Sequence, residues 1–147
     1  MTIPTPEDYH LTIEIPARFA DLDVNMHLNN VAASTFYEQA RVDMHRKTLA
    51  KWLGAEENRS FLLVGRTTIE YWTEGPYPAT YTVGVGVSKI SNSSFVDSLA
   101  LFARGTCIGA CDTVMVHSHG QGKATPIPAD MREALEATRS PSALRFG

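Results

Sequence analysis

The sequence is poor in cysteine, with only Cys107 and Cys111 in 147 residues. These two residues form a CxxxC pair with no further cysteine nearby, which is a weak basis for a metal site. His117 and His119 follow the pair but lie beyond it, in MVHSHG. The pattern favours two small packing residues in a protein of a reducing compartment.

Long hydrophobic runs and an excess of positive charge are also absent. No apolar run approaches the roughly 18 to 20 residues that a membrane span requires. The first ten residues, MTIPTPEDYH, lack the basic and apolar segments of a signal peptide. A net charge of -3 and a pI near 5.9 give no basic footprint for nucleic acid or an anionic membrane. We therefore expect a cytoplasmic protein with neither of these partners.

The size and composition fit one globular domain. The mass of 16.1 kDa leaves little room for a second domain, and 44% hydrophobic residues are enough to form a core. We expect a single domain over residues 1–138 and a flexible tail over residues 139–147.

The hydrophobic pattern predicts one strand followed by a long helix. Residues 10–19, HLTIEIPARF, alternate between apolar and polar positions, as a half-buried strand does. Further on the period becomes helical, with apolar residues at Ala33, Phe36, Tyr37, Ala40 and Met44. Asn29 or Asn30 suits the N-cap and Gly54 suits the end, so we predict a helix over residues 30–53.

The remainder is rich in β-branched and aromatic residues. Four segments predict strands, over residues 61–72, 81–90, 94–103 and 111–118. Residues 123–137 predict an extended segment and a short helix. A single long helix buries its apolar face only if the sheet curls around it. The order therefore predicts an α+β hotdog fold, a curved antiparallel sheet wrapped around one central helix, which usually dimerises.

A strongly polar stretch, DLDVNMHLNN, precedes the helix over residues 21–30. A calcium loop would need glycine where Met26 stands and glutamate where Ala32 stands, so that interpretation fails. A zinc site needs three or four convergent ligands, for which one histidine and two aspartates are weak evidence. We therefore expect no metal or organic cofactor. A loop that only caps the helix is a structural alternative, since Asn, Asp and His are common in turns.

Thioester hydrolysis would use these groups together. The leaving thiolate is stable, with a conjugate acid of pKa roughly 8.5, so a strong general acid is dispensable. Unpaired N–H groups at the helix start can stabilise the developing oxyanion. A nearby carboxylate can activate water or attack directly, and Asp23 lies a few residues before the helix.

The segment RFADLDVNMHLNN, followed by YEQAR, resembles the signature of hotdog acyl thioesterases of the 4-hydroxybenzoyl-CoA thioesterase type. Their signature runs R-[FYW]-x-D-x-D-x-x-x-H-x-N-N, with E-x-A-R in the helix. The second aspartate is the catalytic carboxylate of that family, and this resemblance implies that role for Asp23. The related hydratases carry D-x-N-P-x-H; here His27 comes one residue early and the proline is absent, which disfavours hydration.

The loop is most similar to that of plant-type acyl-carrier-protein thioesterases, which carry D-x-N-x-H-V-N-N-V. This resemblance implies that Asn25 and His27 position the catalytic group or the substrate. Those enzymes also carry L-E-Y-x-x-E in the next strand, which places Glu74 of TIEYWTEG as a second catalytic carboxylate. They contain two hotdog repeats and this chain has one, so a homodimer would replace the tandem arrangement.

Further residues are candidates for binding the substrate. Many relatives have an aromatic residue where Ala33 stands, so this position is expected to make space for an acyl group. Glu38 forms a possible i,i+3 pair with Arg41, but the resemblance also brings it near the pocket. The complete set of predicted substrate-binding residues is Asn29, Asn30, Val31, Ala33, Glu38 and Ser94.

Two functions remain open from the sequence. The first is an acyl thioesterase acting on thioesters of coenzyme A or acyl carrier protein, as a homodimer or a dimer of dimers. The second is a non-catalytic hotdog module that binds an acyl or coenzyme A ligand. Release of free thiol from acyl-CoA substrates distinguishes them.

Overall fold

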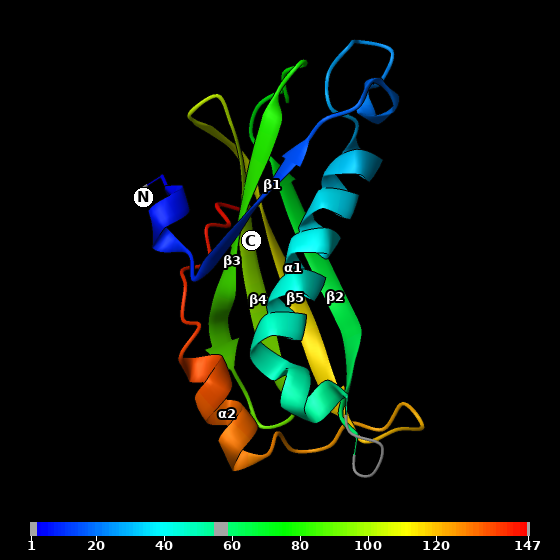
Figure 1. Cartoon of the computed structure of the whole chain (residues 1–147), viewed down its shortest axis with the longest axis vertical. Coiled ribbons are helices and arrows are strands. Elements are labelled where there is room, and N and C mark those ends of the chain that lie inside the picture. Colours follow the sequence, from blue (N-terminus) through cyan, green and yellow to red (C-terminus); the bar gives the residue numbers. More distant parts are fainter. Residues whose placement is uncertain (1–2, 55–58, 147) are drawn as a thin grey trace.

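Five antiparallel strands wrap around one long helix in the computed structural model, which describes residues 3–54 and 59–146 (Figure 1). The sheet order is β1-β3-β4-β5-β2. The strands are β1 Leu11–Pro16, β2 Phe61–Tyr71, β3 Thr80–Ile90, β4 Ser94–Ala103 and β5 Thr106–Ser118. The predicted α+β hotdog fold is confirmed. Residues 1–2 and 55–58 of the predicted domain, and Gly147 of the predicted tail, lie outside the described residues.

The central helix α1 spans Asn30–Leu53, as its apolar period predicts. It lies along one face of the sheet (Figure 1). Its buried residues are Ala32, Ala33, Phe36, Tyr37, Ala40, Arg41, Met44, His45 and Leu49. Ala40 has no exposed surface, and its small side chain lets the helix approach the sheet closely. None of the described helices is long and apolar enough to span a membrane.

The strands bury alternate residues against α1. Tyr81, Val83, Val85 and Val87 of β3 all have 0% exposure and belong to one apolar cluster with the helix. This follows from the two-residue period of a strand, which sends every second side chain to the same face. The short helix α2, Ala129–Glu136, adds Met131 and Leu135 to that core.

The residues after α2 continue along the sheet rather than away from it. The amide of Ser140 donates to Val87 O at 3.0 Å, and the amides of Arg145 and Phe146 donate to the Glu70 carboxylate at 2.6 and 2.7 Å. The flexibility of residues 139–147, and the domain boundary before them, stay predictions.

Strand β2 is a long edge of the sheet. It has 11 residues and, among the described residues, pairs only with β5, whereas the opposite edge, β1, has 6. Several large apolar side chains of β2 are exposed, among them Phe61, Leu63, Val64 and Tyr71. Unpaired backbone groups beside exposed apolar side chains are the features on which a second strand can pair.

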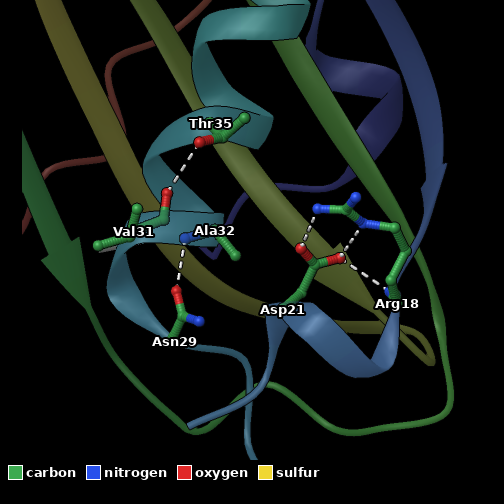
Figure 2. Close-up of polar contacts among 6 residues, drawn as sticks. All are labelled: Arg18, Asp21, Asn29, Val31, Ala32 and Thr35. Carbon is green, nitrogen blue, oxygen red and sulfur yellow. Dashed lines mark hydrogen bonds and ion pairs between the residues drawn. The ribbon is translucent and has the colours of Figure 1, made fainter.

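The loop between β1 and α1 is closed by backbone contacts. The amide of Asn29 donates to Asp21 O at 2.9 Å, and Leu22 and Leu28 form an antiparallel bridge. Asp21 is buried, and Arg18 binds its carboxylate through the main chain and the guanidinium (Figure 2). The side-chain hydrogen bond from Arg18 lowers the pKa of Asp21 below its ordinary value. Asp21 therefore supports the loop.

Met26 turns this loop with a φ of 62°, in the left-handed region. That conformation costs a residue with a side chain about 1–2 kcal/mol, whereas glycine adopts it freely but loses more backbone entropy, about 0.5–1 kcal/mol. Met26→Gly is therefore expected to raise the free energy of unfolding by up to about 1 kcal/mol, measured by urea denaturation.

Val24→Gly is the matched control. Val24 is 98% exposed in the same loop but does not adopt a positive φ, so glycine there should lower stability. Equal effects of the two substitutions would contradict the conformation assigned to Met26.

Candidate active site

A cavity of about 410 Å³ opens between the loop, the start of α1 and the end of β2. It contains six of the ten predicted site residues: Asp23, Asn25, His27, Asn30, Ala33 and Glu74. The other lining residues are Leu28, Tyr37, Glu70, Tyr71, Trp72, Thr73, Gly75, Leu101, Ile108 and Gly109. The mouth is polar and the floor is largely apolar, which suits a ligand with a reactive head and an apolar tail.

Asp23 presents its carboxylate at the mouth of this cavity. One oxygen, Oδ1, accepts the amide of Asn25 at 2.9 Å and the amide of His27 at 3.3 Å. The other oxygen, Oδ2, has no donor among the described residues. The loop therefore orients the carboxylate through one oxygen and leaves the second available for chemistry.

His27 and Glu74 join the loop to the segment after β2. His27 Nε2 lies 3.1 Å from Glu74 Oε2, and the two side chains are 37% and 74% exposed. The backbone supports this approach, because the amide of Leu28 donates to Gly75 O at 3.0 Å. Two segments far apart in the sequence thus share one site.

The start of α1 faces the same cavity. Asn29 is the N-cap, and its side-chain oxygen accepts the amide of Ala32 at 2.6 Å (Figure 2). The amides of Asn30 and Val31 have no acceptor among the described residues. Unpaired N–H groups at the positive end of a helix favour negative charge, such as that on the oxygen of a tetrahedral intermediate.

Four predicted residues do not line this cavity. Asn29 and Val31 line a separate hollow beside β1, and Glu38 lines another hollow, 3.8 Å from Arg41. Ser94 begins β4. Leu101, which lines the cavity, is seven residues further along this strand, a separation of about 23 Å.

Sequence patterns did not identify the cavity floor. Tyr37 shares the apolar period of α1 and looked like an ordinary core residue, whereas Leu101, Ile108 and Gly109 come from two later strands. Only the register of β4 and β5, in which Leu101 pairs with Gly109, brings the strand residues together. No local motif could have identified them.

Glu70 lines the cavity, but its carboxylate already accepts hydrogen bonds from other parts of the chain. Its carboxylate accepts the Trp72 indole N–H at 3.0 Å as well as the amides of Arg145 and Phe146. Burial alone would raise the pKa of Glu70, but these donors lower it overall. A carboxylate that is already satisfied in this way is a poor proton acceptor.

Metal ligation has little support in the described part of the chain. Residues 3–54 and 59–146 contain no group of three or more His, Cys, Asp or Glu side chains placed to hold a metal ion. The titratable groups that line the cavity are the carboxylates of Asp23, Glu70 and Glu74, the imidazole of His27 and the phenols of Tyr37 and Tyr71.

Several solved structures with this fold are more than 25% identical to the chain. The PA5185 protein of Pseudomonas aeruginosa is 27% identical, with a TM-score of 0.74 over 95% of this chain and 98% of that one. A thioesterase of Thermus thermophilus, solved with coenzyme A and Zn, is 26% identical, with a TM-score of 0.78 over 89% and 95%. The YbaW protein of Escherichia coli, at 22% identity, supports the fold alone, with a TM-score of 0.78 over 88% and 98%.

The family comparison extends over most of the chain. A search of curated proteins found no match. The family model described as the thioesterase-like superfamily matches residues 17–135, which include the loop, α1 and all the strands after it. The resemblance to hotdog thioesterases is thereby confirmed. The chain belongs to the thioesterase-like superfamily and is a thioester hydrolase.

Proposed function

We propose that this hydrolase cleaves acyl thioesters of coenzyme A or acyl carrier protein, with Asp23 as its catalytic carboxylate. The observation that carries the proposal is the meeting of three features in one cavity. These are the free oxygen of Asp23, the unpaired amide of Asn30 at the start of α1, and an apolar floor. Together they supply an attacking group, an oxyanion site and a place for the acyl chain.

In this mechanism the thioester carbonyl lies against the start of α1. The amides of Asn30 and Val31 stabilise its oxygen as negative charge develops there. Asp23 activates a water molecule, or attacks the carbonyl carbon itself. The thiolate then leaves without a strong general acid, because its conjugate acid has a pKa of only roughly 8.5.

His27, Glu74 and Asn25 position this chemistry. The Glu74 carboxylate orients the His27 ring through their 3.1 Å contact, and the ring faces the same cavity as Asp23. Asn25 contributes its amide to the Asp23 carboxylate. In the proposal, the substrate is contacted at the helix start by Asn29, Asn30, Val31 and Ala33. Glu38 and Ser94 lie outside the cavity and contact only the carrier, at a distance from the thioester.

Two resemblances bear on whether the acyl group is carried by coenzyme A or by acyl carrier protein. The relative from Thermus thermophilus was solved with coenzyme A, which supports a coenzyme A thioester here. The DVNMHLNNV segment resembles the loop of plant-type acyl-carrier-protein thioesterases, which supports a protein carrier. Both carriers present the same thioester to the site, and kinetics on each separates them.

Asp23→Asn should lower kcat for thiol release from acyl-CoA at least about 100-fold, because the amide neither attacks nor accepts a proton. Asparagine keeps an oxygen for the amides of Asn25 and His27, so the loop should stay folded. Thiol release is followed with a chromogenic disulfide over a panel of chain lengths. Glu74→Gln, which retains an acceptor for His27, should give a smaller loss.

The matched control is Asp43→Asn, a carboxylate on α1 that pairs with Lys47 away from the cavity. It should keep wild-type turnover. Wild-type turnover in Asp23→Asn would contradict the proposal. Coenzyme A binding without thiol release by the wild-type chain would point to a non-catalytic binding module.

We further propose that two copies pair through their β2 edges, as a dimer or as the unit of a dimer of dimers. Antiparallel pairing of β2 would satisfy its free backbone groups and cover Phe61, Leu63 and Val64. A continuous sheet across the pair would also bring the face of α1 that the sheet does not cover toward the second copy.

Val64→Lys should convert this assembly to single chains, because a charge at a paired apolar edge opposes association. Light scattering after gel filtration measures the mass, which should fall from a multiple of two chains toward 16.1 kDa. Glu14→Lys on the opposite edge strand β1 is the control and should leave the mass unchanged. A wild-type mass of one chain would contradict the pairing.

A further inference from the structure

Tyr37 is a buried residue that lines the deep part of the cavity. The residue is 2% exposed and lines the cavity, and its hydroxyl has no hydrogen-bond partner among the described residues. Tyr81 is equally buried, but its hydroxyl donates to Pro76 O at 2.6 Å. A hydroxyl that lines a cavity and has no protein partner is a candidate for a hydrogen bond to a ligand.

The hydroxyl is available as a donor throughout the neutral pH range. Burial raises the pKa of Tyr37 well above its ordinary value of 10.0, so the group stays protonated. The surrounding floor offers Leu101, Ile108 and Ala33, which provide no hydrogen bonds through their side chains. Tyr37 is therefore the residue with a polar side-chain group among these four.

Tyr37 lies beside the part of the cavity that the acyl chain of a bound substrate would occupy. Tyr37 lies seven residues after Asn30, about 10 Å along the helix axis. Helical side chains lean toward the N-terminus, which brings its ring back toward the reacting end. A Cβ on Gly109 would lie 3.5 Å from the Tyr37 hydroxyl, which places the hydroxyl beside this β5 residue of the same cavity.

We propose that Tyr37 makes the site selective for acyl groups that carry an oxo or hydroxyl oxygen a few carbons beyond the thioester carbonyl. This inference rests on the proposed function. Ala33, one turn nearer the helix start, leaves room for the chain to pass, and the oxygen then accepts the Tyr37 hydroxyl. A saturated chain at the same place leaves the hydroxyl unpaired.

The test compares matched substrates in the wild-type protein and Tyr37→Phe. The substrates are octanoyl-CoA, 3-oxooctanoyl-CoA, 3-hydroxyoctanoyl-CoA and 5-hydroxyoctanoyl-CoA. The ratio of kcat/KM for the best oxygenated substrate to that for octanoyl-CoA should fall about 5-fold or more in Tyr37→Phe, the loss expected for one hydrogen bond. Tyr9→Phe removes a buried hydroxyl that has no hydrogen-bond partner among the described residues and lies outside the cavity, so it should keep the ratio.

A binding experiment separates failure of this inference from failure of the proposed function. Calorimetry measures the affinities of two thioethers that cannot be hydrolysed, S-octyl-CoA and S-(3-oxooctyl)-CoA, for both proteins. Hydrolysis of all substrates with the same ratio in wild type and Tyr37→Phe overturns the role of Tyr37 and leaves the thioesterase proposal standing. If no substrate is hydrolysed, the thioesterase proposal fails. In that case an affinity ratio that falls in Tyr37→Phe supports the role of Tyr37, and an unchanged ratio overturns it.

Discussion

The anchoring of the start of α1 is the contact on which the site depends. Asn29 caps the amide of Ala32 and donates its own amide to Asp21 O, while Arg18 holds the buried Asp21 carboxylate. These contacts fix the loop to the helix, and the core residues of α1 fix the helix to the sheet. Asp23 and Asn30, the first residue of the helix, consequently line the same cavity.

The sheet supplies the other wall of that cavity. Strand β2 ends beside the loop, where Gly75 O accepts the amide of Leu28 and Glu74 reaches His27. Beneath them β4 and β5 provide the apolar floor, on which the Tyr37 hydroxyl is the distinctive polar group. In the proposed function, one end of the cavity acts on the thioester and the other discriminates among acyl groups.

Local patterns predicted the elements better than the site. The bounds of α1 followed from a single apolar period and the capping residues Asn29 and Gly54. Strand β5 begins at Thr106, five residues before the predicted start, because Arg104 and Gly105 both adopt positive φ and form a tight hairpin turn. The motif residues Asp23, His27 and Glu74 meet in one cavity, but its floor depends on strand register, which no local pattern reveals.

A crystal structure with a ketone analogue of an acyl-CoA, in which a methylene group replaces the sulfur, tests the central claim most directly. The account predicts that the ketone carbon lies next to the Asp23 carboxylate, with its oxygen within hydrogen-bond distance of the Asn30 or Val31 amide. An acyl group bound elsewhere, with the Asp23 side chain turned toward solvent, would contradict it.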